Sequence, residues 1–223
     1  MKLFRLRYSP YARKVQILLD LQGRDYLAVE VPYGDRSELA RLTGGYIYVP
    51  VLVDDDGTVI TESRRICERL VSDRPGAGFV PAPLDGPIWA YHDWCDGPLE
   101  DLVFRIGSPL VRDQWPTEWE RALYVLIKER KFGAGCVDAW QRDRADLIAR
   151  ANALLAPSVR TLAAQPFLFG AKPTVADAAL YGQFAMLDAV DARLLGAFAP
   201  EIAAWFARVA AAAGSSRQGR GAR

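Results

Sequence analysis

The sequence is poor in the residues that bind metals or cross-link chains. Its 223 residues include three cysteines and a single histidine, His92. Cys67, Cys95 and Cys136 are odd in number and far apart, so they match neither a disulfide framework nor the ligand spacing of a zinc site. We therefore expect no bound metal and no structural disulfide, which favours a reducing compartment, the cytoplasm.

Long apolar runs and an excess of one charge are also missing. No stretch approaches the roughly 18 consecutive apolar residues of a membrane span, and the start, MKLFRLR, is too charged for a signal peptide. The 28 Lys and Arg residues are balanced by 27 Asp and Glu residues. Because a nucleic-acid surface needs clustered positive charge, we expect neither nucleic acid nor membrane as a partner.

Residues 1–80 have the pattern of a small α/β domain. Short strand-like segments alternate with helical patterns, and an Asp-Gly pair between two of the strands is a strong hairpin signal. The expected order is β-α-β followed by β-β-α, with strands over 3–7, 26–31, 51–53 and 58–60 and helices over 12–21 and 63–71.

The remainder of the chain predicts helices alone. Proline and glycine crowd residues 81–87, which is the composition of a linker. Glu120 lies three residues after Thr117, the spacing of a capping box. Residues 214–223 are small, polar and basic, and we expect a disordered tail there. Helices are expected over 87–104, from 117, over 137–164 with a break or kink at Pro157, over 174–190 and over 200–213.

The first motif with chemical content is Tyr8-Ser9-Pro10-Tyr11, between a strand and a helix. A hydroxyl at a helix start lies beside unpaired backbone N–H groups and the positive end of the helix dipole, so it favours an anion such as a thiolate. The alternative is that Ser9 only caps the helix, with Pro10 at its first position, which is a common arrangement.

The second motif is Val49-Pro50-Val51, at the head of a strand. Proline has no N–H to donate, so it indicates an edge position or a cis turn. A cis proline would present the backbone N–H and C=O of Val49 to a peptide-like ligand, as a short added strand. A trans proline before an ordinary strand is the alternative.

The third motif is Glu62-Ser63, at the start of a helix. Together these residues suit an amino acid, because the carboxylate pairs with its ammonium group while the hydroxyl and backbone N–H groups hold its carboxylate. The alternative is a capped helix whose acid complements the dipole.

In this order and spacing, the three motifs resemble the N-terminal domain of the glutathione S-transferase superfamily. The stretch 173–181, PTVADAALY, resembles the signature of that family's helical domain, and residues 200–209 resemble its closing helix. The resemblance implies a thioredoxin-like α/β N-terminal domain over 1–80, a linker over 81–87 and an all-α C-terminal domain over 88–213.

The resemblance also implies a function. Glutathione would be the co-substrate, with Ser9 as the catalytic hydroxyl, the Val49 backbone before cis Pro50 as a clamp, and Glu62 and Ser63 at its γ-glutamyl group. The expected chemistry is attack of the glutathione thiolate on a small, apolar electrophile by a cytoplasmic homodimer. The alternatives are a non-catalytic glutathione- or protein-binding module and a glutathione-dependent isomerase or dehalogenase.

Several assignments remain open between residues. Tyr8 and Tyr11 flank Ser9, and tyrosine activates the thiol in other branches of the family. A second-substrate pocket is expected at Tyr11, Phe104 and Gly107. The run 43–48 is unlike the family's usual sequence, which leaves the glycine end of glutathione unassigned, with Arg36 and Arg41 as available cations. Thr174 and Asp177 match the family's helix-capping pair.

Overall fold

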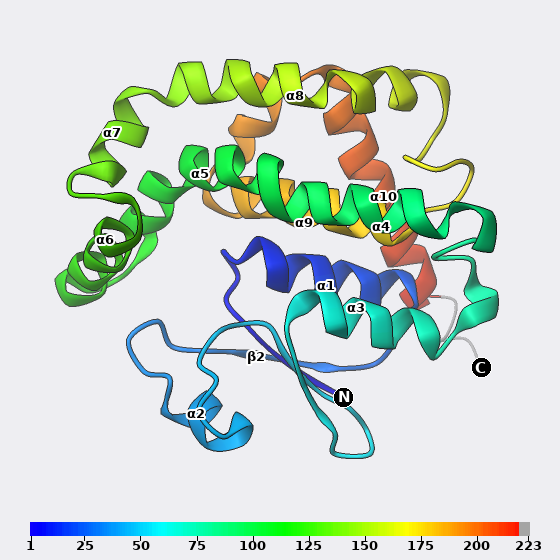
Figure 1. Cartoon of the computed structure of the whole chain (residues 1–223), viewed down its shortest axis with the longest axis horizontal. Helices are drawn as coiled ribbons and strands as arrows, with labels where there is room; N and C mark the ends of the chain where they lie inside the picture. The colour runs from blue at the N-terminus through cyan, green and yellow to red at the C-terminus, as the bar shows by residue number, and fades with distance from the viewer. Residues whose placement is uncertain (219–223) are drawn as a thin grey trace.

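The first domain is a four-stranded mixed sheet with helices on both faces. The computed structural model describes residues 1–218, and Figure 1 traces their path. The sheet order is β2-β1-β3-β4, with β1 parallel to β2 and antiparallel to β3. Its elements are β1 (Lys2–Arg5), α1 (Pro10–Leu21), β2 (Leu27–Glu30), α2 (Ser37–Thr43), β3 (Val51–Val53), β4 (Val59–Thr61) and α3 (Ser63–Ser72).

Alternation along the strands explains the two layers. Leu3 and Leu52 are fully buried on the side of α1 and α3, whereas Phe4 and Val51 join Leu39 of α2 in a separate apolar cluster. Successive strand residues point to opposite faces, so each strand supplies both clusters. Figure 1 accordingly shows α1 and α3 between the sheet and the second domain, with α2 on the far side. The expected strands and helices are confirmed, but α2 was not predicted.

Among the described residues, the regular elements of the second domain are helices and include no β-strand, which confirms the expected fold class. A π-turn, Cys95–Leu99, links α4 and α5 without a gap, so the helix expected over 87–104 continues to Gln114. The first domain ends after η1 (Pro75–Ala77), and the elements that follow are η2 (Ala82–Leu84), α4 (Asp85–Trp94), η3 (Cys95–Leu99), α5 (Glu100–Gln114), α6 (Glu118–Phe132), α7 (Cys136–Arg142), α8 (Arg144–Ala164), α9 (Val175–Asp191), η4 (Ala192–Ala197) and α10 (Pro200–Gln218).

Three expected boundaries are corrected. The helical pattern over 137–164 divides at Asp143, and α8 runs through Pro157 without the expected break. Helix α4 begins at Asp85, inside the expected linker. Helix α10 reaches Gln218, so residues 214–218 continue a helix instead of starting a tail. Residues 219–223, the rest of the expected tail, lie outside the described residues.

The capping pair at the start of α9 is confirmed. Asp177 is fully buried and accepts hydrogen bonds from the Thr174 backbone N–H at 2.8 Å and the Leu168 N–H at 3.0 Å. The indole N–H of Trp205 in α10 also donates to it, at 2.9 Å. One carboxylate therefore ties the start of α9 to the preceding loop and to α10.

A close approach of two helices sets the position of Ser9. At Gly182 of α9, an added Cβ would lie 2.4 Å from the carbonyl oxygen of Pro10 and 2.9 Å from the backbone nitrogen of Lys14. Glycine thus lets the start of α1 lie directly against α9. Because Ser9 caps α1, this contact fixes it relative to the helical domain.

Candidate active site

Ser9 caps α1 with its side chain. Its hydroxyl oxygen accepts the backbone N–H of Ala12 at 3.2 Å, and its own N–H donates to the carbonyl of Leu6 at 2.9 Å. Pro10 occupies the first helical position, and the first turn holds no acid that would offset the positive end of the helix dipole. Because the hydroxyl oxygen is the acceptor in the cap, its proton remains available for donation to a ligand.

The two tyrosines beside Ser9 have different surroundings. Tyr8 meets Trp115 edge-on, with ring centroids 5.5 Å apart. Tyr11 is half-buried in the first turn of α1, and burial, followed by the negative charge of Glu100, raises its pKa far above the usual value. Tyr11 therefore stays protonated, so it is available as a hydrogen-bond donor but not as a base.

Val49 and Glu62 lie at the same end of the β3–β4 hairpin. The Val49–Pro50 peptide is cis, as predicted. Val51 pairs with Thr61 in the antiparallel ladder, so the residues just before β3 and just after β4 are neighbours. The structure therefore brings the second and third motifs together at one edge of the first domain.

Glu62 has an unusual backbone. Its φ is 67°, the only positive φ of a residue other than glycine among the described residues. A side chain in that region costs on the order of 1–3 kcal/mol, and such residues cluster at functional sites. The Glu62 carboxylate is exposed beside Tyr46, and burial together with that carboxylate raises the pKa of Tyr46 to about 12. Ser63, which begins α3, is buried.

The three residues expected in the second-substrate pocket have different surroundings. Gly107 is buried against α9, where an added Cβ would lie 2.8 Å from Met186 Cε and 3.1 Å from Leu187 Cδ2, so it is a packing position and the pocket assignment is corrected. Phe104 packs near Phe132, with ring centroids 5.9 Å apart. Tyr11 follows Ser9 in the first turn of α1.

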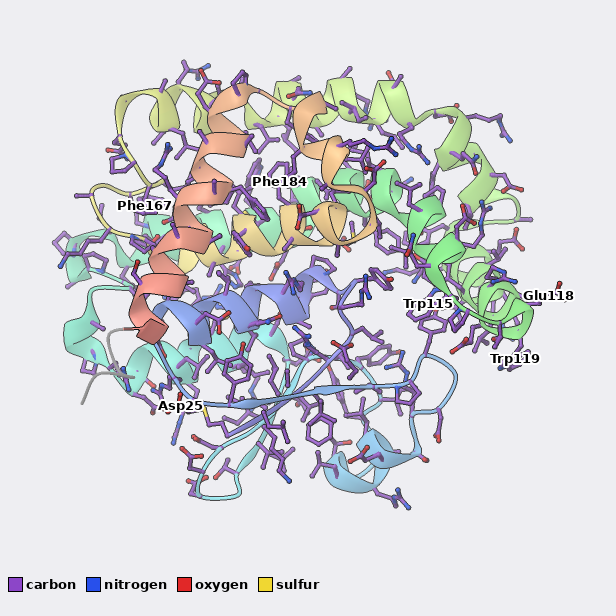
Figure 2. The ribbon with its side chains drawn as sticks, turned by 180° about the vertical axis from the view of Figure 1, so that it is seen from behind. Asp25, Trp115, Glu118, Trp119, Phe167 and Phe184 are labelled. Carbon is purple, nitrogen blue, oxygen red and sulfur yellow. The ribbon has the colours of Figure 1, made fainter. Side chains whose placement is uncertain are left out.

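Sequence reasoning missed an aromatic cluster made by Tyr8, Tyr33, Trp115 and Tyr124. Trp115 stacks on Tyr33 with centroids 4.4 Å apart, and Tyr33 lies 5.6 Å from Tyr124. Figure 2 labels Trp115 where the end of α5 comes down to the first domain. These rings come from β1–α1, the loop after β2, α5 and α6, and no spacing in the sequence joins them.

Charged side chains border this cluster. Lys128 Nζ lies 4.7 Å from the ring centre of Tyr124 and 4.9 Å from that of Phe104. Burial lowers the pKa of Lys128 to about 8 and raises the pKa of Glu100 to about 7. The Arg36 guanidinium lies 5.5 Å from the ring centre of Tyr33.

His92 and Cys67 belong to the core. His92 is fully buried, its Nδ1 lies 3.0 Å from Asp93 Oδ1, and burial lowers its pKa to about 4. Burial raises the pKa of the Cys67 thiol to about 12. Within residues 1–218, no group of three His, Cys, Asp or Glu side chains is placed to hold a metal, and no helix is long and apolar enough to span a membrane.

Surface hollows of appreciable size open elsewhere. One of about 580 Å³ lies beside Trp140 and Arg150, and another of about 640 Å³ lies at the β2 edge of the sheet near Leu27 and Leu42. The first contains no residue predicted to bind glutathione or the second substrate, and the second contains only Arg41, one of the two cations available for the glycine end of glutathione.

Comparison with known families decides the identity of the fold. The N-terminal domain family of glutathione S-transferases matches residues 3–78, and the C-terminal domain family matches residues 137–208. The chain belongs to the glutathione S-transferase superfamily. The resemblance inferred from the motifs is therefore confirmed for both domains.

Relatives match nearly the whole length of this chain. A probable glutathione S-transferase of Oryza sativa subsp. japonica is 27% identical, over 92% of this chain and 82% of the relative. A glutathione S-transferase structure from Rhodospirillum rubrum is 26% identical with a TM-score of 0.71, covering 93% and 86% of the two chains. That of a Ceriporiopsis subvermispora transferase in complex with glutathione is 18% identical, with a TM-score of 0.80 and 96% coverage of both chains.

Proposed function

We propose that the protein is a glutathione transferase that joins the sulfur of glutathione to an electrophilic carbon of a small, largely apolar molecule. The observation that carries the proposal is the Ser9 hydroxyl, which accepts the Ala12 N–H at the start of α1 and keeps its proton for another acceptor. Family membership supports the same conclusion.

Glutathione would lie along the edge of the first domain. The Val49 backbone would pair with its peptide groups, while Glu62 and Ser63 would hold its γ-glutamyl group. The hairpin register supports this arrangement because it makes the Val49 and Glu62 segments neighbours. The similar transferase of Ceriporiopsis subvermispora was solved with glutathione, which supports binding here as well.

Ser9 would act on the protonation of the bound thiol. An ordinary thiol has a pKa of about 8.5, so only a few per cent is thiolate at neutral pH. Lowering that pKa by about two units corresponds to roughly 2.7 kcal/mol. A hydrogen bond from Ser9 and the unopposed end of the α1 dipole both favour the thiolate. The thiolate then forms a C–S bond to the electrophile, whose leaving group departs with its electron pair, and the thiol proton passes to solvent.

Assembly and location follow from the family as predictions. We propose a homodimer, which light scattering of the purified full chain would test, and cytoplasmic location remains a prediction.

Ser9→Ala tests the proposed function. The change should lower conjugation of 1-chloro-2,4-dinitrobenzene by roughly ten- to a thousandfold, as expected for loss of one donor to a developing anion. Glutathione affinity should change little, because the γ-glutamyl clamp and the Val49 backbone are untouched. The ultraviolet absorbance of the thiolate, followed against pH, should report a raised thiol pKa.

Ser72→Ala is the matched control, since Ser72 is exposed at the end of α3 and its hydroxyl donates only to the Arg69 carbonyl. If Ser9→Ala alters neither turnover nor thiol pKa, Tyr8 and Tyr11 are the next candidates. A parent protein that binds glutathione but conjugates no electrophile would favour the binding module, and turnover without a conjugate would favour the isomerase or dehalogenase.

A further inference from the structure

Tyr8 and Tyr11, the two tyrosines that flank Ser9, are both connected with the surroundings of Lys128. Tyr8 begins the aromatic cluster, which continues through Trp115 and Tyr33 to Tyr124, and the Tyr124 ring lies under Lys128. On the other side, the charge of Glu100 acts on both Tyr11 and Lys128. A series of rings in contact therefore begins at Tyr8, beside Ser9, and ends at a cation.

Two cations at the far end of the cluster lack a counter-ion. Lys128 and Arg36 make no ion pair within 4 Å and no side-chain hydrogen bond among the residues that the structure describes. One terminal guanidinium nitrogen of Arg36 is buried without a partner. Both cations instead lie over aromatic rings, Arg36 over Tyr33 and Lys128 over Tyr124.

The acids Asp101, Asp96 and Glu100 do not pair with these two cations. Asp101 pairs with Arg105 at 2.5 Å, and Asp96 pairs with the buried Lys14. Glu100 has a pKa raised to about 7 by burial, so about half of it is protonated at neutral pH. None of these acids forms an ion pair with Lys128 or Arg36 within the described residues, so both cations remain available to an anion. Tyr33 and Phe104 are only partly buried, and partly exposed rings beside cations suit a planar ring that carries an anion.

We propose that the second substrate in front of Ser9 is a planar aromatic electrophile bearing a carboxylate or a similar anionic group, which pairs with Lys128 and Arg36. This inference rests on the proposed transferase function and specifies its substrate class. For 4-chloro-3-nitrobenzoate, the glutathione sulfur forms a bond to the ring carbon that carries chlorine. Chloride leaves with the bonding pair, the thiol proton goes to solvent, and the carboxylate is unchanged.

A binding experiment tests this without relying on catalysis. The full chain, with and without S-methylglutathione, is titrated calorimetrically with the unreactive pair 3-nitrobenzoate and 3-nitrobenzamide. The benzoate should bind about ten- to a hundredfold more tightly, because a hydrogen bond to a charged group is considerably stronger than a neutral one. Lys128→Gln and Arg36→Gln should each move that ratio towards one.

Arg130→Gln is the matched control, since Arg130 is exposed on the same helix and this substitution also removes one positive charge. It should leave the ratio as in the parent. Equal binding of the two ligands by the parent would overturn the proposal. So would a loss of preference in Arg130→Gln as large as in Lys128→Gln, because the selectivity would then be a general effect of charge.

The pH dependence of benzoate affinity distinguishes a charge role of Lys128 from a purely structural one. Benzoate affinity of the parent should fall between pH 7 and 9 as Lys128 loses its proton, whereas Lys128→Arg should hold its affinity, because a guanidinium stays charged. The charged and titratable groups that act on Lys128 are Glu100, Lys131, Cys136 and Arg36. A benzoate preference in the parent that is constant over this range would contradict the role of Lys128.

Failure of this inference and failure of the proposed function are distinguishable. If the parent prefers the benzoate but conjugates neither 4-chloro-3-nitrobenzoate nor 1-chloro-2,4-dinitrobenzene, the transferase function fails and the anion site stands. If it conjugates both and binds the benzoate and benzamide equally, the function stands and the anion site fails.

Discussion

The proposed partners of glutathione come from three short stretches of the first domain, whereas the proposed second substrate faces side chains from both domains. Ser9, Val49 and Glu62 are each placed by local backbone geometry: a helix cap, a cis peptide and a positive φ. The aromatic cluster and Lys128 are placed by packing between α6, α5 and the loop after β2.

This difference predicts which changes the glutathione site and the second-substrate site each tolerate. A site made by local geometry depends on a few backbone conformations and persists if neighbouring domains shift slightly. A site made by packing across domains depends on the distance between them. The contact between α1 and α9 should therefore matter more to the second substrate than to glutathione.

Gly182→Ala should give the largest difference between the effect on conjugation and the effect on glutathione binding. The new methyl group would lie 2.4 Å from the Pro10 carbonyl oxygen, a backbone atom, so α1 and α9 must move apart. Overpacking of this kind costs about 1–3 kcal/mol of stability, and a misplacement near 1 Å lowers turnover about a hundredfold. We expect conjugation to fall roughly ten- to a hundredfold, while glutathione affinity stays within about threefold.

Gly76→Ala is the control, because a Cβ there meets nothing within 4 Å. Thermal unfolding, calorimetry with glutathione and conjugation kinetics on both variants make the comparison. Equal losses in glutathione binding and in turnover for Gly182→Ala would mean that the glutathione site and the second-substrate site depend equally on the contact between α1 and α9.

Two substitutions at Glu62 test how local backbone geometry contributes to the glutathione site. Glu62→Ala and Glu62→Gly both remove the carboxylate, so each should weaken glutathione binding by about ten- to a hundredfold, as expected for a charged hydrogen bond. Glycine adopts the observed φ of 67° without strain. Glu62→Gly should thus be more stable than Glu62→Ala by about 1 kcal/mol. Calorimetry and chemical denaturation test both effects, and unchanged affinity in the two variants would remove Glu62 from the site.

The sequence could predict what depends on neighbouring residues. The helix cap at Ser9, the cis proline, the hairpin and the Thr174–Asp177 cap each have a signal within a few positions, and all are present in the structure. Helix α2 was missed because it is only seven residues long and buries only Leu39.

The residues proposed to contact the second substrate could hardly be predicted from the sequence. Tyr33, Trp115 and Lys128 are far apart in sequence, and their contacts follow from how α5 and α6 pack on the first domain. Gly107 was misassigned for the same reason, since it lies near Phe104 along α5 but packs against α9.

The smallest expected effect is the pH dependence of stability contributed by Glu100. Burial raises its pKa in the folded protein from the ordinary 4.5 to about 7, so the folded state holds a proton that the unfolded state has released. Stability from this group is therefore greatest below about pH 4.5 and falls as pH rises to 7. Glu100→Gln has no such proton, so it should gain stability relative to the parent across that window, by on the order of 1–2 kcal/mol after allowance for solvent screening.

The difference between parent and variant is the quantity to measure, because His92 titrates in part of the same range. Its pKa is lowered from 6.5 to about 4, so it stabilises the folded state above pH 6.5 and that stabilisation is lost as pH falls towards 4, opposite in sign to Glu100. Both proteins contain His92, so its contribution cancels in the difference. Denaturant unfolding at pH 5 and at pH 7.5 gives the two values. A difference that stays constant between them would mean that Glu100 is ionised in the folded protein, and the positive charge near Lys128 would then be balanced from within the chain.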